Sequence, residues 1–462
     1  MIFKQTYLKL IFCCFVTLIS DAVFSQKKDT TITINNIVIV GNKTTKKHII
    51  TRELPFDIGD ELYTSDTALI FARSRYNIFN TQLFNFVAVS YADETFFITV
   101  EEKWYFIPFP VVELADRNFN EWWTQRGRSL KRINLGFRFR YENFRGRKEL
   151  LKVVTQVGFT DKFELYYDIP YINKQQQTGL GFEVSYAANN SVAYRTLDHV
   201  LDYYKGEHVN GVKFRGGMRL IKRPSLYFNH QIGLYYHQNH ISDTIASLNA
   251  NFYGSGKKKQ QFLRANYLIS YDKRDVKFYP IRGYLLQAEL QQFGLGAFND
   301  LSFTQLNTLF GYFLKFKKRW SSIHSFKTKL ALNGDIPYAQ YVGFGYKENF
   351  VRGYELSVID GRHAFLNRNS LRFLLFKKEK VNTYIPIKQF KSTPFSGYLR
   401  LHTDHGFVRH TLDYEQPLAD QYIWSWGLGL DLVTYYEGVL RAEYSFRNGT
   451  DGGFFFHLGM EF

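Results

Sequence analysis

The alternation of hydrophobic and polar residues changes near residue 105. Before this point hydrophobic residues recur at both helix and strand spacing, whereas beyond it they occupy every second position. In residues 133–142 one face carries Ile, Leu, Phe, Phe and Tyr, and the other carries Asn, Gly, Arg, Arg and Glu. Since successive strand side chains point to opposite faces, such a segment has one apolar and one polar side. The pattern predicts a small mixed domain followed by many amphipathic strands.

The same alternation recurs in six further segments, at residues 151–159, 163–169, 226–236, 284–290, 422–432 and 453–462. A soluble sandwich would also alternate, but several of these segments exceed the usual strand length of about five or six residues. Short turns such as 143–146 alternate with long polar loops such as 189–210 and 240–260, which is typical of outer-membrane barrels. Residues 105–462, at about 22 residues per strand and connection, predict an all-β transmembrane barrel of about sixteen antiparallel strands.

Residues 27–104 predict one small α/β domain that precedes the barrel. Its expected elements follow the order strand, helix, helix, strand, strand, at residues 31–40, 46–54, 65–77, 86–89 and 96–100. About 75 residues are enough for such a unit to fold by itself.

Residues 1–25 have the pattern of a secretory signal peptide, with Lys4 and Lys9 preceding an apolar run; a buried helix is the alternative. Both cysteines of the chain, Cys13 and Cys14, lie within this segment. The exported part would then carry no cysteine, which excludes thiol catalysis, zinc–thiolate sites and iron–sulfur clusters.

The composition shows an excess of basic over acidic residues. Aromatic residues make up 18% of the 462 residues, and 59 Lys+Arg against 42 Asp+Glu give a formal net charge of +17. On an exported barrel this charge favours contact with outer-membrane lipid and lipopolysaccharide, and no nucleic acid partner is expected.

The N-terminal domain resembles a POTRA domain, the periplasmic module of the BamA-like outer-membrane assembly and translocation superfamily. The matching segments are I-V-I-V-G-N-K-T-T at 37–45, R-E-L at 52–54, G-D at 59–60, N-T-Q-L-F at 80–84 and V-E-E-K at 100–103. The resemblance implies a single POTRA domain in the periplasm and a barrel of the bacterial surface antigen type.

A turn motif in the barrel region extends the resemblance. Its residues are Asp272, Arg274, Asp275, Pro280 and Gly283. Asp and Arg would close a tight turn through charge-assisted hydrogen bonds, and the Pro and Gly would restart the next strand.

The non-alternating stretch 334–368 contains four residues that match the family's V-R-G-F/Y motif, namely Val351, Arg352, Gly353 and Tyr354. The resemblance implies that this loop folds into the barrel lumen, where its arginine contacts an acidic residue of the wall. Asp404, followed by Gly406, resembles the family's strand ending in D-x-G, and we expect Asp404 to accept hydrogen bonds from Arg352.

One position departs from the family pattern. The strand after this loop often carries a glutamate, whereas Arg372 stands at the expected position here. Glu348 and Asp360 are the candidates to supply the missing carboxylate.

The last strand carries a C-terminal motif. Its apolar face is formed by Phe454, Phe456, Leu458, Met460 and Phe462. The motif resembles the terminal signature by which the assembly machinery recognises outer-membrane barrels.

The sequence lacks the G-x-x-x-x-G-K-[ST], H-E-x-x-H and G-x-S-x-G motifs. His402 and Asp404 share one strand face while His405 takes the other, so one metal ion would meet few of them. We therefore expect no enzymatic activity, no cofactor and no metal.

The resemblance implies an outer-membrane protein that assists insertion, assembly or translocation of other polypeptides. Its expected partners are unfolded or nascent outer-membrane polypeptides and, in a complex, other assembly subunits. The alternative is a passive channel or structural subunit of an outer-membrane complex, and a third reading is a secretion pore for one dedicated partner.

Overall fold

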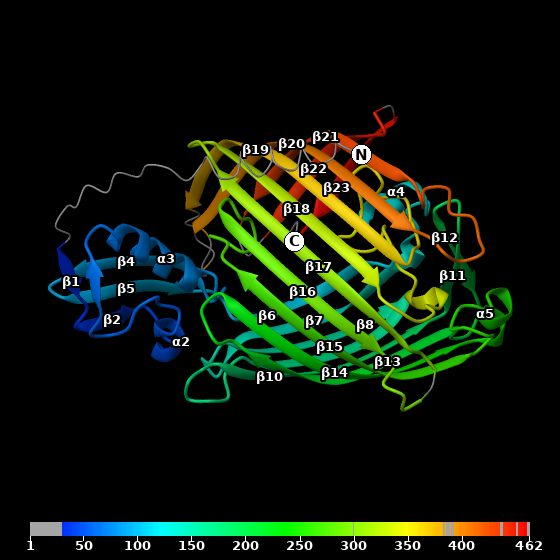
Figure 1. Ribbon diagram of the computed structural model, residues 1–462, viewed down its shortest axis with the longest axis horizontal. Helices are drawn as coiled ribbons and strands as arrows, with labels where there is room; N and C mark the ends of the chain where they lie inside the picture. The colour runs from blue at the N-terminus through cyan, green and yellow to red at the C-terminus, as the bar shows by residue number, and fades with distance from the viewer. Residues whose placement is uncertain are drawn as a thin grey trace, which may run out of the picture.

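The computed structural model describes residues 30–298, 300–381, 384, 389, 392–434, 438–449 and 451–459. It consists of a small α/β domain, blue at the left of Figure 1, and a large β-barrel. The expected signal peptide, together with Met460 and Phe462 of the C-terminal motif, lies outside the described residues.

The N-terminal domain packs two helices against a small sheet. Its elements are β1 (Thr31–Thr33), β2 (Asn36–Val40), α2 (Lys47–Thr51), β3 (Glu61–Tyr63), α3 (Thr67–Phe79), β4 (Phe84–Ala92) and β5 (Thr95–Glu102). β5 lies between β2 and β4, parallel to the first and antiparallel to the second, and β1 pairs separately with β3. The single strand expected at 31–40 is therefore wrong. The segment forms two strands, because residues 31–33 pair with β3 whereas residues 36–40 pair with β5.

Sixteen strands form one continuous antiparallel sheet that curls into a barrel (Figure 1), as the alternation predicted. They are β6 (Phe106–Leu114), β7 (Ile133–Phe144), β8 (Glu149–Gly158), β9 (Thr160–Ile169), β10 (Thr178–Asn189), β13 (Gly211–Lys222), β14 (Phe228–Ile241), β15 (Lys259–Asp272), β16 (Gly283–Phe293), β17 (Phe303–Lys315), β18 (Trp320–Ala331), β19 (His363–Val381), β20 (Ser392–Arg409), β21 (Tyr422–Val433), β22 (Val439–Arg447) and β23 (Asp451–Leu458). Each strand pairs with its neighbour in this order, so β6 and β23 form the two edges of the sheet.

The two faces of the barrel wall differ as the alternation requires. Outward side chains are apolar and exposed, for example Phe137 at 70% and Leu458 at 79%. Phe454 and Phe456 are also exposed, which places the described part of the C-terminal motif on this outer face. Inward positions carry buried charged side chains such as Arg400 and Glu443. An apolar band facing lipid and a polar lumen are the properties of an outer-membrane barrel.

The connections are asymmetric between the two barrel ends. The described connections beside the N-terminal domain have at most ten residues, whereas the longest connections lie at the opposite end. These include a hairpin of β11 (Ser191–Leu197) and β12 (Val200–Lys205), and the helices α4 (Phe119–Thr124) and α5 (Asp243–Leu248). The short 3-10 helices are η1 (Leu130–Arg132) and η2 (Tyr338–Gln340). Among the described residues, none of the helices combines the length and the apolar character needed to cross a bilayer.

Candidate functional site

The long connection between β18 and β19 returns into the barrel, where Arg352 contacts Asp404 of β20. The Arg352 backbone N–H donates to Asp404 Oδ2 at 3.0 Å and its Nε donates to the same oxygen at 2.8 Å. Its Nη2 donates to Asp404 Oδ1, which makes the pair bidentate. Both side chains are buried, with Asp404 fully inaccessible. The contact predicted from the motif is therefore present in the structure.

β19 supplies the remaining contacts of the Arg352 guanidinium. Nη1 donates to Ser370 Oγ at 3.0 Å and Nη2 donates to the Asn369 carbonyl at 3.2 Å. Arg368 approaches Asp404 from the same strand, with its Nε 3.5 Å from Oδ2, and covers the Phe350 ring at 4.6 Å. A second arginine thus shares the carboxylate of Asp404, and its Nη2 donates to the Phe350 carbonyl of the inserted loop.

Arg372 lies away from the Arg352–Asp404 pair. Arg372 lies beneath the β15–β16 turn, where its Nη2 donates to the Pro280 carbonyl and its guanidinium covers the Tyr279 ring at 4.4 Å. The two proposed substitutes for the family glutamate also stand elsewhere. Glu348 is exposed, and Asp360 accepts hydrogen bonds from the hydroxyls of Thr196, Tyr346 and Tyr414.

Gly406 provides the space into which the loop motif packs. A Cβ at this position would lie 2.5 Å from Val351 Cγ2 and 2.7 Å from the Phe344 ring. Val351 is fully buried, and with Tyr354 it belongs to an apolar cluster between the loop and the wall. Gly353 has a φ of +92°, which favours glycine. Each glycine therefore has a structural role in seating the loop.

The predicted turn motif closes as expected. The carboxylate of Asp272 accepts hydrogen bonds from Arg274 Nε at 2.8 Å and Nη2 at 2.9 Å. Asp275 Oδ1 accepts from the backbone N–H groups of residues 276, 281 and 282. Gly283 begins β16 with a φ of +104°, and a Cβ there would lie 2.1 Å from the Lys273 carbonyl.

The N-terminal domain contacts this turn directly. Asn80, just after α3, donates from Nδ2 to the carbonyls of Arg274 and Asp275, and its Oδ1 accepts the Lys277 N–H at 3.1 Å. Asn80 belongs to the N-T-Q-L-F segment of the domain. The turn motif thus connects the domain to the barrel.

A buried ion pair makes a second connection between the domain and the barrel. Glu53 after α2 accepts two hydrogen bonds of 2.7 Å each from Arg223 in the β13–β14 turn. Burial alone would raise the pKa of Glu53, but the charge and hydrogen bonds of Arg223 outweigh it and lower this pKa to about 2. Arg52 strengthens the contact through a 2.6 Å hydrogen bond to the Gln176 carbonyl.

The edge of the sheet at β23 is covered by a side chain from α4. Phe456 N–H donates to Asn120 Oδ1 at 3.1 Å, and Asn120 Nδ2 donates to the Phe456 carbonyl at 3.3 Å. The amide thereby takes the place of a neighbouring strand, since it offers one acceptor and one donor to the same residue. Within the described part of the chain, no hydrogen-bonded register joins β6 to β23. Asn120 lies in the connection between β6 and β7, so this connection contacts the edge strand β23.

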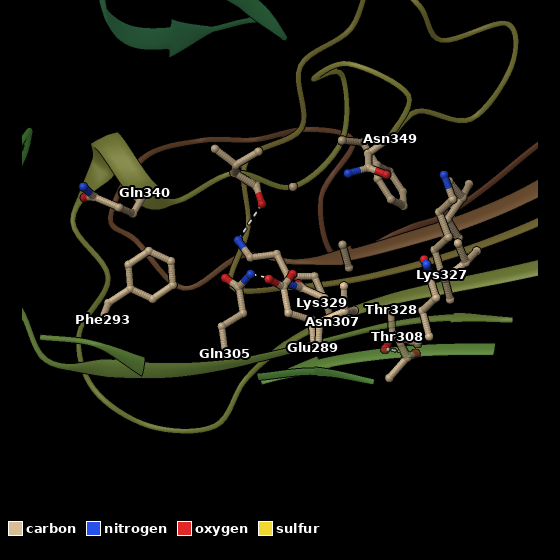
Figure 2. A pocket seen from close by; sticks show the side chains of 18 residues that line it. Glu289, Phe293, Gln305, Asn307, Thr308, Lys327, Thr328, Lys329, Gln340 and Asn349 are labelled. Atoms are coloured by element: carbon tan, nitrogen blue, oxygen red, sulfur yellow. Dashed lines mark hydrogen bonds between the residues drawn. The ribbon is translucent and has the colours of Figure 1, made fainter. Parts of the chain in front are cut away.

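A cavity of about 480 Å³ remains between the inserted loop and strands β15 to β19. Figure 2 shows Lys329 and Gln305 among its lining side chains. Lys329 Nζ donates to the Val342 carbonyl at 2.5 Å and holds the loop, while Gln305 donates to Asn307 at 2.8 Å. The lumen therefore combines a filled region around Arg352 with a polar space beside it.

Sequence reasoning identified Arg352, Asp404 and Gly406 but missed Arg368 and Asn120. Arg368 has the inward parity of β19, so its face was predictable from the alternation. Asn120 gave no such indication, because its partner lies 336 residues further along the chain.

Residues 143–462 match the Omp85 superfamily domain. The structure is similar to BamA from Haemophilus ducreyi lacking POTRA domains 1-3, with 15% identity, 93% of this chain and 84% of that chain covered, and a TM-score of 0.53. CdiB from Escherichia coli gives 10% identity, 96% and 92% coverage and a TM-score of 0.48. No curated protein sequence matches the chain.

Proposed function

Because this chain belongs to the Omp85 superfamily, we propose that it assists insertion, assembly or translocation of other polypeptides at the bacterial outer membrane. The observation that carries the proposal is the sheet edge at β23, which is held by the Asn120 side chain. A peptide strand can replace a side-chain amide at such an edge, since it offers the same donor and acceptor along its whole length.

The inserted loop would keep this edge in position. Arg117 after β6 donates to the Gly345 carbonyl at 2.6 Å and to the Leu356 carbonyl at 3.1 Å, so the loop supports the segment that carries Asn120. Arg352 in turn fixes the loop to β20. The Arg352 pair would thus act by positioning, and no covalent chemistry is involved.

The N-terminal domain would act as a periplasmic POTRA domain that captures clients. Its three-stranded sheet leaves β2 and β4 at the edges, where an extended polypeptide can add as a further strand. Its contacts with the β13–β14 and β15–β16 turns would direct a captured segment toward the barrel.

Site-specific photo-crosslinking tests the proposal. A photoreactive residue at Val112 on β6 or Leu458 on β23, both exposed on the outer face, should capture nascent outer-membrane polypeptides in cells. Leu290 on β16 is exposed on the same face away from either edge and serves as the matched control. Equal capture at all three positions, or capture at Leu290 alone, would contradict a role for the edges.

The passive channel is the second candidate, and the polar cavity beside Lys329 is the observation that favours it. Depletion of the protein separates the two functions when barrel levels and small-solute uptake are measured together. Falling levels of other outer-membrane barrels support assembly. Altered solute uptake with every barrel level unchanged would support the channel instead.

A further inference from the structure

Three side chains from separate parts of the chain converge in the lumen beside the Arg352 loop. Glu355 comes from the loop, Glu443 from β22 and His457 from β23, and one ligand atom of each lies within 4.8 Å of the others. His457 Nε2 is 3.2 Å from Glu443 Oε1 and 3.4 Å from Glu355 Oε1. We propose that this cluster binds one Zn²⁺ ion and thereby fastens the loop to the last two strands.

The spacing of the cluster fits a metal ion. Four ligands around Zn²⁺ at about 2.1 Å lie about 3.4 Å from one another in a tetrahedron. The two nitrogen–oxygen distances above have this length, so both pairs can share an ion with little movement. One imidazole and two carboxylates form a three-ligand set that leaves a fourth position for water.

The polar atoms are also available. Glu355 is 1% exposed, yet neither of its carboxylate oxygens makes a hydrogen bond. Glu443 Oε1 and His457 Nε2 are likewise buried without a hydrogen bond. Buried polar atoms are ordinarily hydrogen-bonded. These three oxygens and one nitrogen have only the ion-pair contacts of His457 with the two carboxylates, and an ion shared among them would supply the ligand contacts they lack.

Neighbouring groups orient the three ligands. Arg400 Nη2 donates to Glu443 Oε2, which leaves Oε1 directed toward His457. The Phe350 ring stacks on His457 at 5.5 Å between centroids. Asn118 Nδ2 donates to the Glu355 carbonyl at 2.8 Å and fixes the loop backbone there. Outer contacts of this kind hold ligands in place at metal sites.

A bound ion would join the inserted loop to the edge strand of the sheet. Since Glu355 directly follows the V-R-G-Y motif, Zn²⁺ would add a second attachment of the loop beside the Arg352–Asp404 pair. This site rests on geometry alone and is independent of the proposed function.

Zinc titration of the full-length protein, folded in detergent without a histidine tag, tests the site. We expect one equivalent of Zn²⁺ to bind, and Glu355→Gln or His457→Gln to weaken binding at least tenfold. His208→Gln removes a histidine of an exposed loop and should leave binding unchanged. Heat-modifiable gel mobility establishes that each variant is folded.

X-ray absorption of the zinc-loaded wild-type protein provides a test that needs no variant. One imidazole with oxygen ligands at about 2.0–2.1 Å is expected. A six-oxygen hydrated ion, no bound zinc, or binding unaffected by both ligand substitutions would show an ion-pair network only and overturn the proposal.

Discussion

Replacing Arg352 by alanine should destabilise the barrel strongly. The change removes the bidentate partner of Asp404, together with the hydrogen bonds to Ser370 and the Asn369 carbonyl. Breaking a buried ion pair by deleting one partner costs about 3–5 kcal/mol, because the other charge stays buried. Arg368 remains 3.5 Å from Asp404 and compensates in part. We therefore expect a loss of about 3 kcal/mol, at the lower end of this range.

Guanidinium unfolding in detergent micelles, followed by tryptophan fluorescence, measures this loss, and unheated gel mobility reports the folded fraction. Arg352→Lys keeps the charge but not the forked geometry and should give an intermediate loss. Removing both partners, with Arg352→Met and Asp404→Leu together, should cost less than the sum of the two single losses, because the interaction lost in each single variant is the same one. A loss below about 1 kcal/mol for Arg352→Ala, or a double variant whose loss equals the sum of the singles, would refute the reasoning.

Gly406→Ala should lower the free energy of unfolding by roughly 1–3 kcal/mol, because its Cβ would meet Val351 at 2.5 Å; Gly216→Ala on β13, whose Cβ meets only ordinary contacts, should leave the unfolding midpoint nearly unchanged. Asn120→Ala should speed amide hydrogen exchange in residues 451–458 about tenfold, through the loss of both hydrogen bonds to Phe456; unchanged exchange measured by mass spectrometry would disprove the edge contact. The pKa of Glu53 is lowered to about 2, so ionised Glu53 stabilises the docking of the domain on the barrel fully above about pH 4.5. As the pH falls toward 2, the docking free energy should decrease by up to about 3 kcal/mol. Limited proteolysis between the domain and the barrel should increase over this pH range. Glu53→Gln should lose most of that dependence, and an identical profile for both proteins would contradict it.

The alternation was sufficient to predict the barrel. A two-residue period with aromatic residues on one face specifies long amphipathic strands, and 358 residues allow about sixteen of them. The turn motif was equally accessible, because the groups that close it lie within a dozen residues of one another. Local chemistry of this kind needs no tertiary partner.

The N-terminal domain was predicted less well. Its two helices and last two strands were expected, but strand 31–40 proved to be β1 and β2, and β3 was missed. A three-residue strand such as β3 has too few positions to show a period, and its pairing with β1 depends on the folded domain.

The sequence by itself determined which face of each strand a residue occupies, and tertiary structure decided its height along the barrel. Arg368, Ser370 and Arg372 all have inward parity on β19, yet only the first two lie at the level of Arg352. Two residues of strand advance about 6.6 Å, which moves Arg372 beneath the β15–β16 turn. The height of a residue along the barrel depends on the stagger of the strands around the whole sheet. The contacts of Arg352 with Asp404 and of Asn120 with Phe456 depend on the same stagger. These pairs exist because the curled sheet brings distant segments to one level, which no local pattern encodes.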